Sequence, residues 1–297
     1  MAKIIAMMNQ KGGVGKTTSS VNLAACLAVA EKRTLLIDLD PQGNGSLSIG
    51  LAKETFKEKN IYHALIGQIE LKEAIYESEL PFFHICPSDN NLSGAEIELV
   101  SLFARESKLK NAFKSVDKDY DYIIIDCPPS LGLLTVNALN AAHSYIVPMQ
   151  TEYLAMEGLA QLLNTVRLIR TSLNPSLELD GILLTMYDSR SGLHKQVATE
   201  IKTHFGDVVF KTIIPRNVKL AECPSFGKPI ILYDIESKGS EAYLALAKEI
   251  ILKERFKGNT EAPKESGSEK EPESVLMNSI PDLSKINPAD EPPIFDQ

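Results

Sequence analysis

Cysteine is scarce in this chain, and the spacing of the few that are present excludes several kinds of protein. The 297 residues include four cysteines, and none of them lies in a C-x-x-C pair. Zinc ribbons and small disulfide-stapled domains both need closely spaced cysteines. The cysteines are therefore expected to be buried thiols that pack as small apolar side chains. They stand at Cys26, Cys86, Cys127 and Cys223.

Long hydrophobic runs are also absent. No segment approaches the roughly 18 consecutive apolar residues that a membrane-spanning helix needs. The first residues lack the apolar stretch and small-residue cleavage site of a signal peptide. These two absences predict a cytoplasmic protein. Apolar residues make up 44% of the chain and charged residues 24%, which is ordinary for a globular protein with a large core.

Positive charge is not in excess, since the net charge of the chain is −8. Taken alone, this value argues against a nucleic-acid-binding protein. The negative charge is unevenly distributed, because residues 258–297 hold nine acidic residues and three lysines, a net of −6. They also hold six of the sixteen prolines. This composition predicts a disordered acidic tail at 258–297 behind a nearly neutral domain at 1–257, which leaves room for a local basic patch.

Within residues 1–257, short apolar runs alternate with amphipathic segments. Continuous apolar strands between helices are typical of a parallel sheet that is covered on both faces. We therefore predict an α/β fold with a doubly wound, mostly parallel sheet flanked by helices. Strands are predicted at residues 3–8, 34–37, 122–125, 144–148, 181–185 and 208–214. Helices are predicted at residues 17–30, 95–115, 154–172 and 240–255.

A glycine-rich segment between the first predicted strand and helix has the properties of a phosphate-binding loop. Glycines lack Cβ atoms, so the backbone can curl around an anion, and the following helix adds the positive end of its dipole. Lys16 can then reach the β- and γ-phosphates of ATP, and the Thr17 hydroxyl can bind magnesium. The predicted ATP-binding segment comprises Lys11, Gly12, Gly13, Val14, Gly15, Lys16, Thr17 and Thr18.

This loop departs from the usual pattern G-x-x-x-x-G-K-[ST] at its first glycine. Gln10 stands at that position, and an additional lysine, Lys11, follows it. The variant is the deviant Walker A motif, and the chain resembles the ParA/MinD family of P-loop ATPases, in particular its chromosomal ParA (Soj) branch. The resemblance covers residues 3–252 and ends before the acidic tail.

Acidic residues follow two of the predicted strands. Asp38 and Asp40 follow the strand at 34–37, and Asp126 follows the strand at 122–125. The carboxyl ends of parallel strands form the ligand-binding edge of such a sheet, so these side chains should lie beside the loop. Asp126 is predicted to hold magnesium, as the acid after an apolar strand does in P-loop proteins. The resemblance further implies that Asp40 positions the attacking water and that Asp38 supports the magnesium shell.

Lys11 has a special role in the resembled family, where the equivalent lysine crosses a dimer interface. There it touches the nucleotide phosphates of the partner, and two ATP molecules lie between the subunits. Burying two triphosphates face to face requires additional positive charge, which agrees with an extra lysine. We therefore expect an ATP-sandwich homodimer in which Lys11, Lys16 and Asp40 are catalytic.

The resemblance also places the base of the nucleotide. Equivalent loops surround the adenine in the family, and here they contain Met186, Pro215 and Asn217. Met186 and Pro215 offer apolar faces, whereas Asn217 can read the edge of the base. Glu152 is expected near the ribose or the opposing subunit.

Basic residues gather in the C-terminal half of the domain. Arg190 and Lys219 match positions that bind DNA nonspecifically in the Soj-like branch once the ATP-bound dimer has formed. Lys219 stands where an arginine is common among relatives, so a phosphate contact is kept but bidentate geometry is lost. The sequence has no helix-turn-helix signal, and contact with the DNA backbone is therefore the expected mode. The other members of this group are Lys195, Lys202, Lys211, Arg216 and Lys228.

The resemblance implies a DNA-partitioning ATPase that is associated with the nucleoid. ATP would form the dimer, the dimer would bind DNA, and a ParB-type partner would trigger hydrolysis and release. Slow intrinsic turnover is expected, because Asp40 orients water without a strong general base. Whether the cargo is a chromosome, a plasmid or another assembly is left open.

The alternative is a MinD-like ATPase that cycles on membranes to place the division site. MinD proteins end in a basic amphipathic helix that lies on the membrane. This chain ends in an acidic segment, and although its last helix ends with Lys253, Arg255 and Lys257, the apolar residues of that helix are expected to pack on the sheet. No membrane partner is therefore expected. A cluster-bearing relative such as the nitrogenase iron protein is disfavoured by the scattered cysteines.

Overall fold

The structure, a computed structural model, describes residues 1–152 and 155–260, with side chains up to residue 256. Most of the predicted tail, residues 261–297, lies outside the described residues, as does residue 154 at the start of a predicted helix. The predicted domain boundary after residue 257 falls inside the last helix, which continues to Thr260. The division into a domain and a tail therefore stays a prediction.

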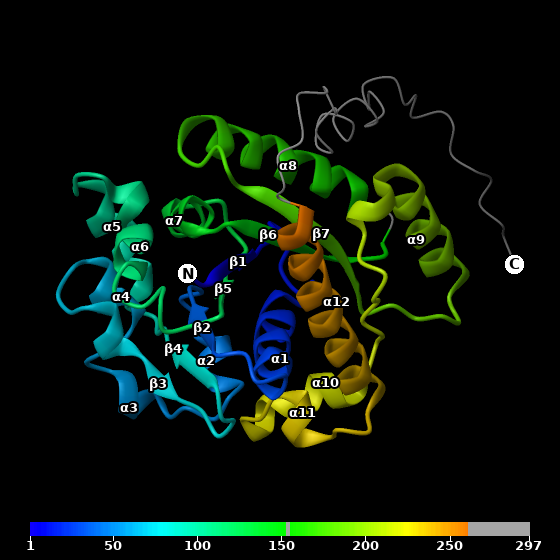
Figure 1. Cartoon of the computed structure of the whole chain (residues 1–297), viewed down its shortest axis with the longest axis horizontal. Coiled ribbons are helices and arrows are strands. Elements are labelled where there is room, and N and C mark those ends of the chain that lie inside the picture. The colour runs from blue at the N-terminus through cyan, green and yellow to red at the C-terminus, as the bar shows by residue number, and fades with distance from the viewer. Residues whose placement is uncertain (153–154, 261–297) are drawn as a thin grey trace, which may run out of the picture.

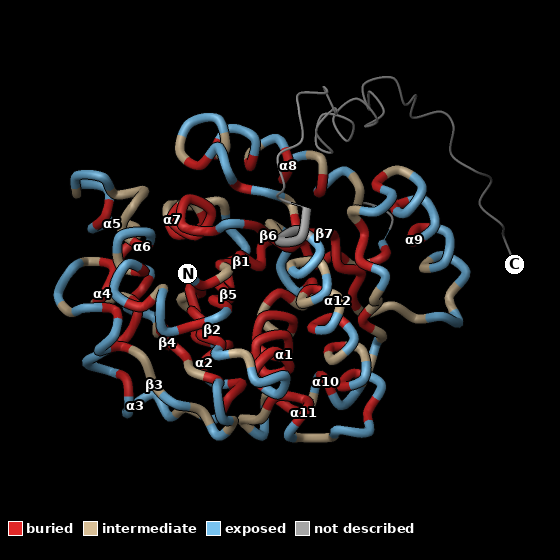
Figure 2. The backbone as a smooth tube through the Cα atoms, in the orientation of Figure 1, coloured by how far each residue is buried: buried red, intermediate tan, exposed pale blue. Residues whose placement is uncertain are grey.

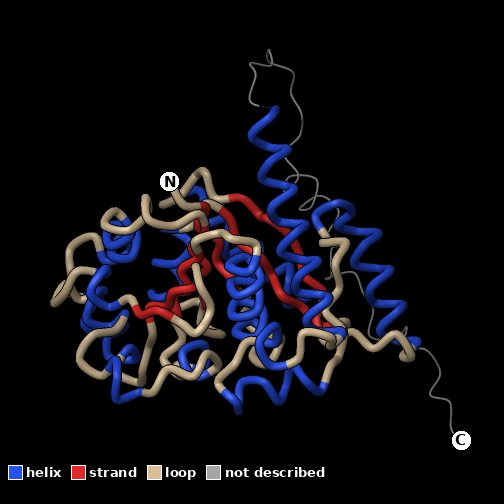
Figure 3. The backbone as a smooth tube through the Cα atoms, turned by 60° about the horizontal axis from the view of Figure 1, so that its bottom comes forward, coloured by secondary structure: helices blue, strands red, loops and turns tan. Residues whose placement is uncertain are grey.

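A mostly parallel sheet of seven strands forms the centre of the described part of the chain (Figures 1 and 3). Its strand order is β3-β4-β2-β5-β1-β6-β7, and only the pair β3 and β4 is antiparallel. The order reverses beside β1, because the chain first moves to β2 on one side and later to β6 and β7 on the other. Such a reversal opens a crevice at the carboxyl ends of the strands. The strands are β1 (Lys3–Met7), β2 (Thr34–Asp38), β3 (Tyr76–Glu77), β4 (Phe83–Cys86), β5 (Tyr122–Asp126), β6 (Ser144–Gln150) and β7 (Glu178–Thr185).

Helices cover both faces of the sheet. They are α1 (Lys16–Val29), α2 (Asn44–Leu47), α3 (Lys53–Phe56), α4 (Ile61–Leu65), α5 (Leu92–Val100), α6 (Lys108–Phe113), α7 (Leu133–Ala141), α8 (Ala155–Ser172), α9 (Gly192–Phe205), α10 (Val218–Glu222), α11 (Ile230–Tyr233) and α12 (Lys238–Thr260). Short 3₁₀ turns lie at Leu71–Ala74, Arg105–Ser107, Gly206–Val208 and Cys223–Phe226.

Side chains that alternate along the strands divide the core into two clusters. In β1, Ile4 and Ala6 pack with α4 to α9, whereas Ile5 and Met7 pack with α1, α11 and α12. Because successive strand residues point to opposite faces, an apolar run can fill both clusters at once. Figure 2 shows α1 almost continuously buried, and α9 alternately buried and exposed. The predicted doubly wound α/β fold is confirmed, and the four cysteines are buried free thiols as expected.

The single helix predicted at 95–115 is wrong. The segment contains the end of α5, a turn at residues 101–104, a 3₁₀ turn and α6. Ala104 takes a φ of 53°, which no α-helix accommodates. Two asparagines of α7 satisfy the backbone groups that this break exposes: Asn137 bonds the nitrogen of Leu109 and the oxygen of Arg105, and Asn140 bonds the oxygen of Glu106. A tertiary contact therefore overrides the local helical pattern.

The strand predicted at 208–214 is also wrong, although the segment runs beside β7. Isolated bridges join it to that edge, at Ile182 with Val209 and at Tyr187 with Pro215, and the nitrogen of Ile214 donates to the carbonyl of Leu184 at 2.8 Å. The carboxylate of Glu249 on α12 accepts hydrogen bonds from the nitrogens of Lys211 and Thr212 at 2.9 and 3.0 Å. These donors point to a helix, so they cannot continue a ladder with β7.

Apolar residues along one face of α12 pack against the sheet and α1. Leu246, Ala247 and Ile250 are buried, and the Tyr243 hydroxyl lies 3.0 Å from that of Ser19 on α1. Lys253 donates to the carbonyl of Asp180 at 3.1 Å. Across residues 1–152 and 155–260, no helix combines the length and the apolar character that a membrane crossing requires.

Candidate nucleotide-binding site

The predicted phosphate loop connects the carboxyl end of β1 to the amino end of α1. Gly13 and Gly15 have φ values of 74° and 85°, in the left-handed region that glycine adopts without strain. A Cβ atom at Gly12 or Gly13 would meet nothing within 4 Å, so both glycines line open space. The first turn of α1 leaves its N–H groups without intrahelical partners. Together these features form a cradle for an anion.

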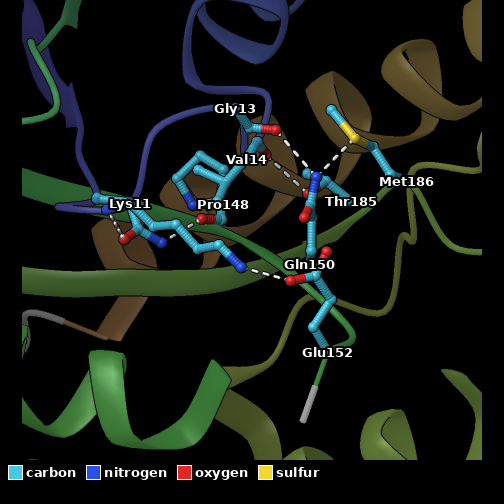
Figure 4. Close-up of polar contacts among 9 residues, drawn as sticks. Lys11, Gly13, Val14, Pro148, Gln150, Glu152, Thr185 and Met186 are labelled. Carbon is cyan, nitrogen blue, oxygen red and sulfur yellow. Dashed lines mark hydrogen bonds and ion pairs between the residues drawn. The ribbon is translucent and has the colours of Figure 1, made fainter. Parts of the chain in front are cut away.

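Side chains from the strand ends hold the loop from behind (Figure 4). The Gln150 amide donates to the carbonyl of Gly13 at 2.9 Å, and the Thr185 hydroxyl donates to that of Val14 at 2.8 Å. Asn9 ties the start of the loop to β6, since its amide donates to the carbonyl of Pro148 at 2.7 Å. The cradle is therefore fixed in shape by the sheet itself.

The two lysines of the loop have opposite surroundings. Lys16 is only 7% exposed, and its ammonium group donates to the carbonyl of Lys11 at 3.2 Å. Burial lowers the pKa of Lys16, and the nearby charges of Asp126 and Asp40 oppose this effect. Lys11 is exposed, and its side chain reaches Glu152, with which it forms an ion pair (Figure 4). The structure thus places one lysine inside the cradle and the other outside it.

Asp38 and Asp126 meet at the carboxyl ends of neighbouring strands. They are paired residues of β2 and β5, and both are fully buried. Burial raises the pKa of each carboxyl group, and the proximity of Asp38 raises that of Asp126 further. The hydrogen bond from Ser20 and the nearby hydroxyl of Thr17 partly offset the increase in the pKa of Asp126. A cation at this point would relieve the repulsion between the two acids.

The hydrogen bonds of the two acids differ in a way that separates their roles. Both oxygens of Asp38 are occupied, Oδ1 by the nitrogen of Asp40 and Oδ2 by the nitrogen and hydroxyl of Ser46. Asp126 accepts from the Ser20 hydroxyl at 2.9 Å through Oδ1, while its buried Oδ2 has no hydrogen-bond partner among the described residues. An unpaired buried carboxylate oxygen is the kind of atom that a magnesium ion or its water shell would satisfy.

The donor set fits an ion that also binds phosphates. Among residues 1–152 and 155–260, no group of three or more His, Cys, Asp and Glu side chains is arranged to hold a metal. Magnesium at a phosphate site commonly takes only one or two protein ligands, the remainder coming from water and phosphate oxygens. Thr17 and Asp126 supply such a set at the mouth of the cradle.

Asp40 lies in the loop that follows β2, close to the two buried acids. It is 8% exposed, and its Oδ1 accepts from the nitrogen of Gln42 at 3.0 Å. The Ser88 hydroxyl donates to its carbonyl oxygen at 2.6 Å, which fixes the backbone of this loop. The structure therefore brings the carboxylates of Asp38, Asp40 and Asp126 to the same edge as the phosphate loop.

The loops expected around the adenine lie next to the phosphate loop. Met186 takes a φ of 50°, and its Cε atom lies 3.7 Å from where a Cβ of Gly15 would stand. The bridge between Tyr187 and Pro215 joins the loop that contains Met186 to the loop that contains Pro215 and Asn217. The carbonyl of the Asn217 side chain caps α10 by accepting from the nitrogen of Leu220 at 3.2 Å. The amide nitrogen of the Asn217 side chain has no hydrogen-bond partner in the described part of the chain and remains for a base.

The two residues expected to bind DNA follow these loops in the chain and lie on the surface. Arg190 precedes α9, and its side chain is 89% exposed. Lys219 lies on α10, and its side chain is 46% exposed. Both pair with a carboxylate of the chain, Asp188 and Glu222 respectively.

Several residues of the site escaped the sequence interpretation. Asn9, Gln150 and Thr185 shape the loop, and Ser46 and Ser88 hold the acids, yet none belongs to a recognised motif. A signal was present for three of them, because polar side chains at the carboxyl ends of parallel strands lie at the ligand-binding edge. The serines had no such signal, since only the fold brings them to Asp38 and Asp40.

Comparisons with known proteins agree with this geometry. The family signature that matches residues 2–179 is described as an AAA domain. The chain is 55% identical over 250 residues to the sporulation initiation inhibitor protein Soj of Bacillus subtilis (strain 168), covering 84% of this chain and 98% of Soj. It is 52% identical over 254 residues to the chromosome partitioning protein ParA of Myxococcus xanthus (strain DK1622), covering 86% and 89% of the two chains.

A solved structure shares the fold and part of the sequence. Cobyrinic acid a,c-diamide synthase of Mycobacterium smegmatis, crystallised with ADP and magnesium, superimposes with a TM-score of 0.76 at 35% identity. The match covers 90% of this chain and 100% of that one. Identity above 50% to curated relatives over most of their length, together with the deviant phosphate loop, establishes the family. The chain belongs to the ParA/Soj family of chromosome-partitioning P-loop ATPases.

Proposed function

We propose that this protein is an ATP-dependent dimerisation switch that binds DNA nonspecifically and partitions a chromosome or plasmid. Hydrolysis of ATP, stimulated by a ParB-type partner, resets the switch. The position of Lys11 is the observation that supports this most directly. A monomeric P-loop site needs the one lysine that lies inside its cradle, and Lys16 fills that place. Lys11 stands outside on an exposed rim, where a second subunit can meet it.

Each residue of the site has a defined task in this proposal. The backbone of residues 12–18 and the ammonium group of Lys16 bind the ATP phosphates, and Thr17 and Asp126 hold the ion. Magnesium, when bound, neutralises charge on the phosphate oxygens. Asp40 orients the attacking water, and Asp38 keeps Ser46 and the β2 loop in place. Because no strong general base lies among these groups, intrinsic turnover is slow.

The proposed dimer requires Lys11 to exchange its partner. In the single chain, the ammonium group of Lys11 is paired with Glu152, and both side chains are about half exposed. Exposed ion pairs contribute about 0–1 kcal/mol, so this pair is easily given up for the phosphates of a nucleotide. A charge buried against a triphosphate between two subunits contributes considerably more.

Replacing Lys11 with alanine should separate ATP binding from dimerisation. The Lys11→Ala variant keeps the cradle and Lys16, so it should bind ATP with near-normal affinity. Its ATP-dependent dimer should weaken by roughly 30-fold or more, since a buried charge contact is lost, and hydrolysis should be lost with it. Equilibrium binding of a fluorescent ATP analogue and analytical ultracentrifugation with ATP and magnesium measure the two properties.

The matched control is Lys57→Ala, which removes an exposed lysine next to α3. This variant should dimerise and hydrolyse ATP like the wild type. An ATP-dependent dimer of normal stability in Lys11→Ala would refute the role proposed for Lys11.

DNA binding should depend on both nucleotide and salt. Contacts with the phosphate backbone release counterions, so affinity should fall steeply between roughly 50 and 200 mM salt. We expect a random-sequence duplex to bind in the presence of ATP and magnesium, and only weakly with ADP. Fluorescence anisotropy measures both dependences. Binding that ignores nucleotide or salt would contradict this part of the proposal.

The MinD-like alternative finds less support in the fold. The side chains of α12 that lie in the core are Tyr243, Leu246, Ala247 and Ile250. Among the large apolar side chains described for this helix, only Leu252 and Phe256, near its described end, are exposed to a membrane surface. Pelleting with anionic liposomes in the presence of ATP tests the alternative directly. Sedimentation with liposomes and failure to bind duplex DNA would favour membrane cycling over partitioning.

A further inference from the structure

The two basic residues expected to contact DNA are both paired with acids of the same chain. Arg190 binds Asp188 through two parallel hydrogen bonds, Nε to Oδ1 at 3.0 Å and Nη2 to Oδ2 at 2.8 Å. Lys219 donates to Oε2 of Glu222 at 3.1 Å. The bonds to Arg190 occupy the edge of the guanidinium group that would otherwise grip a phosphate. A phosphate that binds this edge of Arg190 has to displace the carboxylate of Asp188, and at Lys219 the carboxylate of Glu222 offsets the charge that attracts DNA.

Both acids are held in place by further contacts, so the pairing is part of the local structure. Asp188 also accepts from the backbone nitrogen of Arg190 at 3.0 Å. The Tyr233 hydroxyl donates to Glu222 at 3.0 Å, and the ammonium group of Lys219 lies 5.6 Å from the centre of the Tyr233 ring. The pKa of Asp188 and that of Glu222 are both lowered, in each case chiefly by the hydrogen bond from the basic partner.

One pair lies on the loop that carries Met186, and the other lies on α10, directly after the loop that carries Pro215 and Asn217. Asp188 and Arg190 follow Met186, while Lys219 and Glu222 follow Asn217. The loops are joined directly by two backbone hydrogen bonds. The nitrogen of Arg216 donates to the carbonyl of Tyr187 at 2.9 Å, and the nitrogen of Tyr187 donates to the carbonyl of Ile214 at 3.1 Å. The two pairs therefore follow, within a few residues, backbone segments that are bonded to each other.

We propose that Asp188 and Glu222 set the DNA affinity of this protein, by competing with DNA phosphates for Arg190 and Lys219 while no ATP is bound. The inference rests on the proposed DNA binding and states how the affinity for DNA is regulated. In the nucleotide-free chain, the acids occupy the two cations and keep affinity low. When ATP orders the loops around Met186 and Asn217, the cations turn from carboxylate to phosphate.

Amide substitutions test this idea with little disturbance of the loops. Asp188→Asn keeps an oxygen to accept from the nitrogen of Arg190, and Glu222→Gln keeps one for the Tyr233 hydroxyl. Each variant should raise the affinity of the nucleotide-free, full-length protein for a random-sequence duplex by about two- to fivefold, the value of one exposed ion pair. The gain should be smaller with ATP, because the pairs are then already open.

The control is Glu54→Gln, which removes the same charge from an exposed position on α3. This variant measures the effect of net charge alone. It should raise the affinity for DNA less than Asp188→Asn or Glu222→Gln does, and by the same factor with and without ATP. A double-mutant cycle adds a second criterion. In an Arg190→Ala background, Asp188→Asn should no longer raise DNA affinity, whereas Glu222→Gln should still do so.

The possible failures can be told apart. If the wild type binds no duplex with ATP and magnesium, the proposed DNA binding itself is wrong. If the wild type binds DNA but Asp188→Asn and Glu222→Gln behave like Glu54→Gln, the acids do not set affinity and only this inference is overturned. An equal gain from Asp188→Asn with and without Arg190 would overturn it as well.

Discussion

At the scale of single residues, this site keeps buried charges close together. Asp38 and Asp126 are buried side by side, and Lys16 is nearly buried beside them. Desolvation disfavours the charged forms of all three, so their pKa values move toward neutrality. Burying these charged groups costs free energy when no ligand is bound. Magnesium and phosphates carry the opposite charges, so their binding offsets that cost. The free chain is thereby destabilised at the point where the ligand binds.

Asp126→Asn should therefore stabilise the nucleotide-free protein while removing its activity. The folded-state pKa of Asp126 is raised above the unfolded value of about 3.9. Its contribution to stability is thus fully present below about pH 4 and is lost as pH rises through the folded pKa. The variant should exceed the wild type in free energy of unfolding by about 1–3 kcal/mol at pH 8, and by less at pH 5.

Urea denaturation at the two pH values measures this difference. Asp207→Asn, at an exposed aspartate, serves as the control and should show no pH-dependent gain. ATP with magnesium should stabilise the wild type but not Asp126→Asn. A variant that is less stable than the wild type at pH 8 would contradict this account.

At the scale of elements, side chains that reach between segments override local patterns. The segment at 208–214 has a strand-like sequence, but two of its backbone nitrogens donate to Glu249. The predicted helix at 95–115 is interrupted where Asn137 of α7 forms hydrogen bonds with its backbone. The Glu249 contact matters for the site, because the same segment leads into Pro215 and Asn217. A carboxylate on α12 therefore helps to position the loop that is expected to hold the base.

Glu249→Ala should destabilise this segment and weaken nucleotide binding. Three hydrogen bonds to the carboxylate are lost, from two nitrogens and from the Thr212 hydroxyl. The expected cost is about 1–3 kcal/mol in free energy of unfolding. Glu241→Ala on the same helix removes only an exposed pair with Lys238 and should cost at most about 0.5 kcal/mol. Equal losses in the two variants would show that the Glu249 contact has no special role.

At the scale of the whole molecule, the core residues that the structure describes all lie in the part of the chain that its relatives share. The match to Soj of Bacillus subtilis spans 250 residues and covers 98% of that protein. Both hydrophobic clusters are built from residues up to Ile250, with Ile251 packed against one of them. We therefore predict that residues 261–297 contribute nothing to the stability of this core.

A chain that ends at Thr260 should fold and bind nucleotide like the full chain. No residue of either cluster is removed, so the thermal midpoint and the affinity for an ATP analogue should be unchanged. Differential scanning calorimetry and fluorescence titration test this, with a chain that ends before Tyr243 as the destabilised control. A clear loss of stability on removal of residues 261–297 would place these residues in the folded domain.

The sequence by itself determined the fold class, the phosphate loop and the acids of the site. These features depend on local rules: apolar runs form buried strands, glycines allow the loop, and the acids that follow β2 and β5 must meet at one edge of a parallel sheet. The membership of the ParA/Soj family also followed from residues 11–18 and their context.

The tertiary structure alone decided what holds these parts in place. Asn9, Gln150 and Thr185 fasten the loop from other strands, Ser46 and Ser88 hold the acids, and Lys11 pairs with a residue far along the chain. The partners of Arg190 and Lys219, by contrast, are near neighbours in the chain, yet only loop geometry shows that they are engaged. Periodicity and motifs report which backbone forms. A hydrogen bond between distant segments depends on their distance and direction, which exist only once the sheet has assembled.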